Sequence, residues 1–236
     1  MNLRRSLPPS LKNRLRPLYA ALRPNKYWAE LGFWQSAHQA DGGAFNNSFY
    51  RGLMLGMAGE EDASFLAGKI VLDFGCGPRG SLVWATPARL RVGVDVLVDR
   101  YAEAFPADLI AHGMVYVKCT ERVIPVPSDF ADVVYTLNAM DHVNAFPAMC
   151  RELLRILRPG GDFIGSFNLE EPRSPTEPQR LTEETIRREL LDHLEVQSYR
   201  ATLPGPENVY SPFFEGLIPY EQGRKGVLWT RARKPG

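Results

Sequence analysis

The chain has 236 residues, of which 44% are hydrophobic and 23% are charged, and its formal net charge is +1. This length suits one sizeable hydrophobic core, and the nearly neutral charge does not by itself indicate a nucleic-acid partner. Since the sequence has no run of 18 apolar residues and no apolar segment after Arg5, we expect neither a transmembrane helix nor a secretory signal.

Cysteines and histidines are scattered along the sequence. The three cysteines show no CxxC spacing, and the four histidines do not cluster. This pattern favours neither a disulfide framework nor a metal site, so we expect no bound metal and a cytoplasmic location.

The first 27 residues form a basic arm. They hold seven lysines and arginines and no acidic residue, so the rest of the chain carries a net charge of −6. The arm also has leucines at helical spacing, namely Leu11, Leu15, Leu18 and Leu22. We expect it to pack on its own domain. Contact with an anionic membrane surface or with RNA stays open as an alternative.

The next segment, residues 28–62, is rich in aromatic residues and then acidic. Gly42 and Gly43 mark a turn between two predicted helices. We therefore divide the chain into a basic arm and helical cover, residues 1–62, and a main domain, residues 63–236.

Short apolar runs alternate with helical segments in the main domain. The runs lie at residues 69–74, 91–96, 114–119, 131–137 and 161–167, and a sixth run at 226–232 indicates a closing strand. Runs rich in valine and isoleucine with helices between them are typical of buried parallel strands, so we predict an α/β fold.

Three helices are predicted between these runs. One extends from about Ala145 to Leu157, with Asn144 as its N-cap and the turn 159–161 after it. Another starts near Thr182, and a third is expected to follow the glycine-rich segment from Ser81 onward.

The glycine-rich segment is the sharpest signal. Residues 71–80 read VLDFGCGPRG, so a buried strand runs directly into closely spaced glycines that let the backbone approach a ligand. Asp95 ends the next run, where a carboxylate can accept hydrogen bonds from both hydroxyls of a ribose. Asp73 favours a cationic ligand over a pyrophosphate, which a nearby carboxylate would repel. S-adenosylmethionine has both a ribose and a cationic amino-acid end.

Residues 71–80 resemble motif I of the class I S-adenosylmethionine-dependent methyltransferases, written D/E-x-G-x-G. Four further segments resemble later motifs of this family in the same order: 93–96, 124–134, 138–143 and 157–161. The resemblance extends over residues 69–167. It implies a Rossmann-like, doubly wound, mostly parallel seven-stranded sheet with helices on both faces and an N-terminal helical extension. It also implies S-adenosylmethionine as cofactor and S-adenosylhomocysteine as product.

The resemblance also implies roles for the residues of motif I. Asp73 and the loop that follows it, made of Phe74, Gly75, Cys76 and Gly77, would bind the methionine end of the cofactor.

Further cofactor contacts are implied at the ends of the later strands. Asp95 would bind the ribose hydroxyls, and Val96 would flank the adenine. Glu121, displaced by one position from the family's usual acid, is the candidate contact for the adenine amino group. Asn138 lies where the cofactor passes.

The transferred methyl group is already electrophilic, so alignment with the acceptor and exclusion of water supply most of the rate. A hydroxyl acceptor also loses a proton, which a general base can take. Asp141 and His142 follow the fourth apolar run, close to the expected position of the methyl group, and are predicted as the catalytic pair. A purely structural role for His142 stays open.

We predict methyl transfer to a small-molecule acceptor, at a hydroxyl oxygen of a sugar-derived or other specialised metabolite. Two alternatives are kept: an RNA methyltransferase anchored by the basic arm, and a non-catalytic cofactor-binding partner subunit. Asp73 disfavours a nicotinamide oxidoreductase.

Overall fold

The computed structural model describes residues 26–174 and 176–236. The predictions of packing, membrane contact or RNA contact for residues 1–25 lie outside this part of the chain. None of the helices that are described has the length and apolar character needed to cross a membrane.

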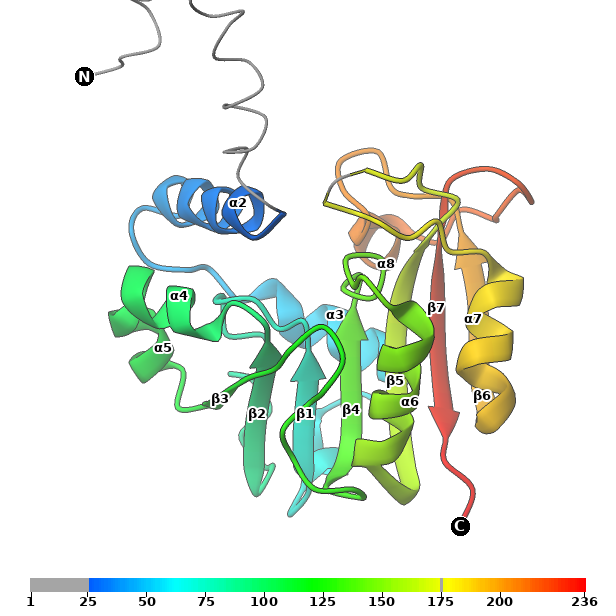
Figure 1. Cartoon of the computed structure of the whole chain (residues 1–236), viewed down its shortest axis with the longest axis horizontal. Coiled ribbons are helices and arrows are strands. Elements are labelled where there is room, and N and C mark those ends of the chain that lie inside the picture. The colour runs from blue at the N-terminus through cyan, green and yellow to red at the C-terminus, as the bar shows by residue number, and fades with distance from the viewer. Residues whose placement is uncertain (1–25, 175) are drawn as a thin grey trace, which may run out of the picture.

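Within the described residues, seven strands form one sheet in the order β3-β2-β1-β4-β5-β7-β6 (Figure 1). The strands are β1 (Ile70–Phe74), β2 (Leu90–Asp95), β3 (Val115–Lys118), β4 (Ala131–Leu137), β5 (Leu157–Leu169), β6 (Glu195–Thr202) and β7 (Gly226–Arg233). Strands β1 to β5 pair in parallel, and β7 is antiparallel to both β5 and β6. The predicted mostly parallel seven-stranded sheet is confirmed.

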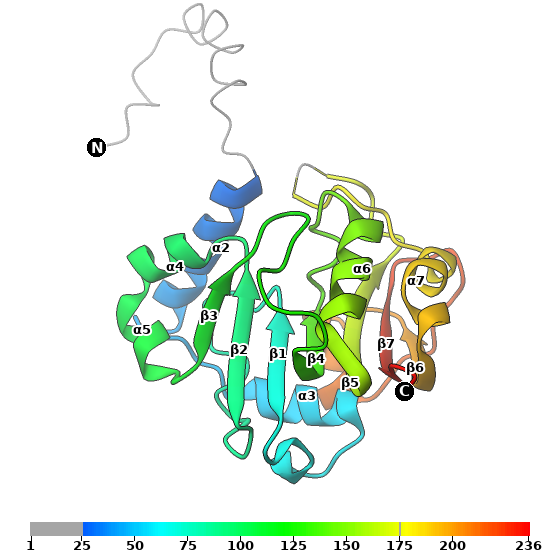
Figure 2. The ribbon, with the colours of Figure 1, turned by 60° about the horizontal axis from the view of Figure 1, so that its bottom comes forward.

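Helices cover both faces of the sheet (Figures 1 and 2). The α-helices are α2 (Lys26–Ala40), α3 (Phe49–Ala58), α4 (Val98–Ala104), α5 (Pro106–Ala111), α6 (Phe146–Ile156), α7 (Glu183–Glu189) and α8 (Ser211–Glu215), and two short 3-10 helices lie at Ala63–Leu66 and Leu191–His193. Helices α6 and α7 pack on one face, whereas α3 packs on the other. Helix α2 lies above α4 and the carboxyl end of β2 (Figure 1).

Two hydrophobic clusters hold these layers together. On one face, α6 buries Met149 and Leu153, four residues apart, against the sheet. On the other, α3 buries Leu53 and Met57 at the same spacing. Every residue of β4 is buried, because this central strand has helices on both of its faces.

The helix expected from Ser81 is absent, so that prediction is wrong. Residues 77–84 form consecutive turns, in which the Val83 N–H donates to Gly80 O at 3.1 Å. The Arg91 side chain binds Val83 O at 2.9 Å, so a tertiary contact takes a carbonyl that a helix would use. The glycine loop consequently lacks the helix N-terminus that follows it in many nucleotide-binding folds.

Asn144 is not the N-cap of α6, as the sequence predicted. Ala145 holds that position without a side-chain cap, and the Asn144 N–H donates instead to Glu121 at 2.9 Å. The helix predicted near Thr182 is confirmed as α7. Its N-cap is Thr182, whose hydroxyl accepts a hydrogen bond from the Thr185 N–H at 3.1 Å.

Strand β7 is joined to β5 by a buried ionic cluster. The Asp162 carboxylate accepts hydrogen bonds from Arg231 and Arg233, each at 3.0 Å. Arg231 also pairs with Glu60 at 2.7 Å, which ties the segment after α3 to the sheet. The Asp162 side chain is only 3% exposed, so water screens these pairs weakly.

We predict that Asp162→Ala lowers the free energy of unfolding by about 3 kcal/mol or more, because it removes one of the two carboxylates that pair with the largely buried Arg231. The matched control is Asp99→Ala, which removes an exposed ion pair with Lys118 and should cost less than about 1 kcal/mol. Urea unfolding of both variants measures the difference. Equal losses would contradict the structural role given to Asp162.

Candidate active site

The loop that follows β1 has no room for a side chain at Gly75 or at Gly77. Gly75 has a φ of 73°, and a Cβ there would lie 2.1 Å from the Cβ of Ala139. Gly77 has a φ of 56°, and its Cβ would lie 2.5 Å from the Trp34 ring. Both positions therefore require glycine for conformation and for space.

Two carboxyl groups flank this loop at the ends of β1 and β2. The Ser81 hydroxyl donates to Asp73 Oδ2 at 2.5 Å, whereas Oδ1 is buried and finds no partner among the described residues. Burial raises the pKa of Asp73 to about 7, against the opposing effect of the Ser81 hydrogen bond.

Hydrogen bonds compensate the cost of burying the carboxylate better at Asp95 than at Asp73. Its two oxygens accept hydrogen bonds from the N–H groups of Leu97, at 2.8 Å, and Gly77, at 3.2 Å. Burial nevertheless raises the pKa of Asp95 to about 6. Each carboxylate oxygen keeps further acceptor capacity, so Asp95 can still bind a hydroxyl group in the cavity.

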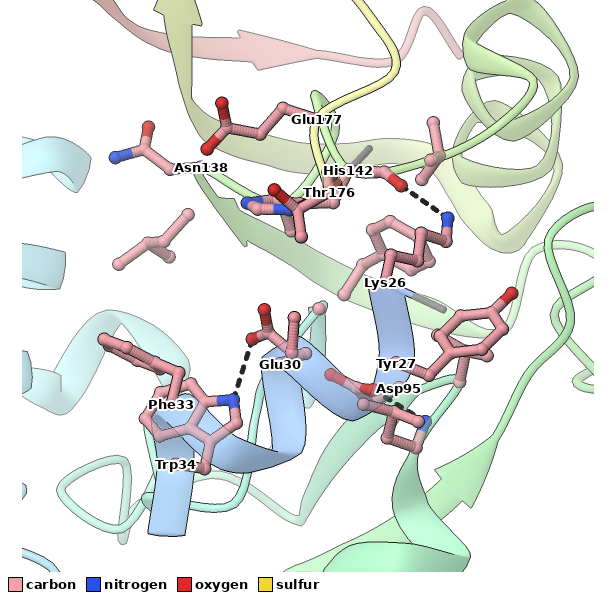
Figure 3. A pocket seen from close by; sticks show the side chains of 18 of the residues that line it. Lys26, Tyr27, Glu30, Phe33, Trp34, Asp95, Asn138, His142, Thr176 and Glu177 are labelled. Carbon is pink, nitrogen blue, oxygen red and sulfur yellow. Dashed lines mark hydrogen bonds between the residues drawn. The ribbon is translucent and has the colours of Figure 1, made fainter. Parts of the chain in front are cut away.

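A cavity of about 540 Å³ opens at this edge of the sheet (Figure 3). This volume is typical of small-molecule sites. Seven of the predicted site residues line it: Phe74, Gly75, Asp95, Val96, Glu121, Asn138 and His142. The other four are buried beside the lining residues: Asp73, Cys76, Gly77 and Asp141.

Helix α2 covers the cavity and is held there by polar contacts. The Tyr27 hydroxyl donates to Glu121 at 2.6 Å, and Lys26 forms an ion pair with the same carboxylate. Burial disfavours the charged form of Glu121, but the hydrogen bonds from Lys26 and Tyr27 prevail and lower its pKa. Glu121 thus lies at the cavity as predicted, with its carboxylate bound to the covering helix.

Asn138 directly follows β4 and lines the cavity. Its φ is 46°, a left-handed conformation that asparagine tolerates better than most residues. Both Nδ2 and Oδ1 are buried and have no partner among the described residues. Unpaired buried polar atoms cost free energy, so this amide is suited to bind a polar group of a ligand.

His142 lines the cavity, and its backbone carbonyl accepts a hydrogen bond from Lys26 of α2 at 2.7 Å (Figure 3). Asp141 is buried beside it. His142 Nδ1 lies 3.1 Å from Thr176 O. Since a carbonyl oxygen only accepts, Nδ1 carries the hydrogen and Nε2 keeps a lone pair in the neutral imidazole. Asp141 Oδ1 lies 3.9 Å from Nε2, and burial raises the pKa of Asp141.

Arg79 brings a positive charge to the cavity. Its guanidinium lies 5.8 Å from the ring centroids of Trp34, Phe45 and Phe49, and its Nη2 pairs with Asp41 at 2.9 Å. Its Nε is buried without a partner among the described residues. Arg79 is thus a largely desolvated cation beside the glycine loop.

Sequence reasoning missed Glu177, Thr176 and, among the cavity-facing residues of α2, Tyr27 and Glu30. Glu177 and Thr176 come from a proline-rich loop whose path no local pattern specifies. In α2, the aromatic residues were visible in the sequence, but the face of the helix that meets the cavity was not.

The comparisons with known proteins agree with this geometry. A family model described as a methyltransferase domain matches residues 72–165. Over 102 residues, 41% of this chain, the sequence is 30% identical to the sterol 24-C-methyltransferase erg6 of Aspergillus fumigatus. That match spans about a quarter of the relative, 27% of its length.

Solved structures show the same fold. A chain in the complex between the Haloferax volcanii Trm112 methyltransferase activator and a candidate methyltransferase has a TM-score of 0.62 and 15% identity, covering 90% of this chain and 99% of that one. Geranyl diphosphate C-methyltransferase from Streptomyces coelicolor A3(2), solved with Mg²⁺, geranyl diphosphate and S-adenosylhomocysteine, has a TM-score of 0.50 and 18% identity, covering 73% and 76%. At these identities the likeness concerns the fold alone.

Residues 72–165 match a methyltransferase domain, and the sheet order and the glycine loop are those of a Rossmann-like fold. These matches favour the S-adenosylmethionine-dependent methyltransferases as the family and S-adenosylmethionine as the cofactor.

We predict that Asp73 makes the stability of the ligand-free protein depend on pH. Its pKa rises from 3.8 to about 7 on folding, so the folded state binds this proton more tightly than the unfolded chain. The resulting stabilisation is fully present below pH 3.8 and is lost as the pH rises through about 7.

The variant Asp73→Asn cannot ionise at this position. Its free energy of unfolding, relative to that of the natural protein, should therefore be higher at pH 8 than at pH 5. Urea unfolding of both proteins at the two pH values gives the difference. A stability gap that does not change with pH would contradict a buried, protonatable Asp73.

Proposed function

We propose that this protein transfers the methyl group of S-adenosylmethionine to a hydroxyl group of a small molecule. The observation that carries the proposal is that Gly75 of the glycine loop, Asp95 and His142 line one cavity, with Asp73 buried beside the loop. Cofactor recognition and a base for the acceptor thus meet in one enclosed space.

The polar groups left unpaired around the loop fit the cofactor. The free oxygen of Asp73 suits the ammonium group of the methionine moiety, and the Asp95 carboxylate suits the two ribose hydroxyls. Val96 would flank the adenine. Glu121, although bound to α2, would meet its amino group, and Asn138 would bind the methionine end.

In this proposal, the Arg79 side chain provides the positive charge that a helix N-terminus would otherwise provide. Since the turns after the glycine loop provide no helix N-terminus, the positive charge for the methionine carboxylate has to come from a side chain. Arg79 lines the cavity next to the loop, and only Asp41 pairs with it among the described residues. We assign it the carboxylate.

S-adenosylmethionine, when bound, supplies an electrophilic methyl group. Within the protein, His142 Nε2 would accept the proton of the acceptor hydroxyl, because its lone pair is free and Nδ1 is fixed on Thr176 O. Asp141 would then stabilise the imidazolium through its carboxylate, 3.9 Å away. The cover of α2 would exclude water from this site.

The cavity favours a small acceptor over a macromolecule. Helix α2 closes one side with Tyr27, Glu30 and Trp34, and the volume of about 540 Å³ must hold both the cofactor and the acceptor. Sugar-derived and other specialised metabolites with hydroxyl groups have suitable size. The three free cysteines are all buried, which fits a reducing compartment, and we propose the cytoplasm as the site of the reaction.

A transfer assay with a labelled methyl group and a panel of hydroxylated metabolites tests the reaction. On an accepted substrate, we predict that His142→Gln lowers kcat by about 10²- to 10⁴-fold, the usual contribution of a general base, with a smaller change in KM. The matched control is His193→Gln, since His193 is exposed and lies outside the cavity. Unchanged kcat in His142→Gln would refute the base role.

The role of Arg79 is tested with two ligands that differ at the methionine end. We predict that Arg79→Ala weakens binding of S-adenosylhomocysteine by about tenfold or more, the effect of losing one charged hydrogen bond. Binding of 5′-methylthioadenosine, which has no carboxylate, should not change. Arg89→Ala is the control, because Arg89 is exposed. Equal losses for both ligands would contradict the assignment.

A further inference from the structure

Three potential metal ligands converge at the wall of the cavity. One carboxylate oxygen of Asp141, one of Glu177 and a ring nitrogen of His142 all lie within 4.8 Å of one another. Figure 3 shows Glu177 next to His142, whose backbone carbonyl accepts a hydrogen bond from Lys26 of α2. The sequence predicted no metal site, because Glu177 is 35 positions from His142 and no ligand spacing connects them.

The three groups offer lone pairs but no hydrogen to one another. Asp141 is 1% exposed, and its Oδ1, which faces His142 Nε2, has no hydrogen-bond partner among residues 26–174 and 176–236. Within the same residues, no lysine or arginine pairs with Asp141 or Glu177. Several facing acceptors without a positive group between them are unfavourable, so the cluster is built for a cation.

The supporting contacts are those that orient metal ligands. His142 donates its other ring N–H to the carbonyl of Thr176, which directs the Nε2 lone pair toward the cluster. The second oxygen of Asp141 accepts a hydrogen bond from Asn168 at 2.9 Å. Outer partners of this kind fix the tautomer and the orientation of ligating side chains in metalloproteins.

The loop that carries Glu177 is joined to the segment that carries the other two ligands. The Glu177 N–H donates to the Ser174 hydroxyl at 3.0 Å, within a turn. The Gln179 side-chain amide donates to the carbonyls of Val143 and Asn144, each at 3.1 Å. The relative positions of the three ligands therefore do not depend on a bound ion.

We propose that Asp141, His142 and Glu177 form a binding site for one divalent transition-metal ion, with Zn²⁺ as the best match. One imidazole nitrogen and two carboxylate oxygens suit Zn²⁺, and three protein ligands leave an open coordination position toward the cavity. Mg²⁺ prefers oxygen ligands in octahedral geometry and should bind less tightly. A bound ion takes the Nε2 lone pair, so His142 cannot accept the proton of the acceptor hydroxyl at the same time.

Calorimetric titration of the tag-free full chain with Zn²⁺ tests the site directly. We expect one ion per chain. Glu177→Gln should lower the affinity for Zn²⁺ by about tenfold or more, because changing even an outer partner of a metal ligand has an effect of that size. The matched control is Glu221→Gln, because Glu221 is exposed and pairs only with Arg224. The three cysteines are buried and free, so they are poorly accessible to the ion.

A spectroscopic readout identifies the ligand nitrogen. In a protein labelled with ¹⁵N-histidine, Zn²⁺ should shift the Nε2 resonance of His142, assigned with His142→Gln, and leave that of His193 unchanged. No binding of Zn²⁺, or binding that Glu177→Gln does not weaken, would overturn the proposal.

The effect of the ion on methyl transfer separates this inference from the proposed reaction. With an accepted substrate, saturating Zn²⁺ should lower turnover of the natural protein, and Glu177→Gln should be less sensitive. A rise in turnover would overturn the mutual exclusion and the base role of His142, because the ion would then activate the acceptor.

Discussion

The burial of two carboxyl groups at the ends of adjacent parallel strands is the constraint on which the site depends. Asp73 and Asp95 lie behind and beside a glycine loop that cannot accept a Cβ, so the chain brings its backbone and two acids to one small surface. Burial alone would keep both acids protonated at moderate pH. Two backbone N–H groups offset more of the cost of burial at Asp95 than the single Ser81 hydrogen bond offsets at Asp73. The uncompensated oxygen of Asp73 is where a cationic ligand gains most.

Two features distinguish this site from a simple nucleotide-binding edge. Turns replace the helix that commonly follows the glycine loop, and Arg79, surrounded by three aromatic rings, provides the positive charge instead. Helix α2 then closes the cavity through its contacts with Glu121, the residue proposed to meet the adenine. The same helix supplies Trp34 against Gly77, so the cover and the cofactor loop are packed as one unit. Cofactor binding and closure are therefore physically connected.

The sequence predicted the sheet well because its strands are buried and rich in β-branched residues. The bounds of β4 were predicted to the residue, whereas β6 was not identified, since this edge strand is half-exposed and lacks an apolar run. The helix at Ser81 failed because Arg91, ten residues away in the chain, binds the turn carbonyls. The predicted ends of the strands also gave the positions of Asp73, Asp95 and Asn138 at one edge of the sheet. Glu177 and the face of α2 depend on loop paths and helix docking, which no local pattern encodes.

The central claim is that this edge binds S-adenosylmethionine and its product, and calorimetry tests it most directly. The purified protein would be titrated with S-adenosylhomocysteine and, separately, with NAD, in the natural form and as Asp95→Ala. The account predicts binding of S-adenosylhomocysteine that Asp95→Ala weakens by about tenfold or more, as expected when a buried ligand loses a charged hydrogen-bond partner, and no binding of NAD. Binding of NAD without binding of S-adenosylhomocysteine would contradict the cofactor assignment and every role derived from it.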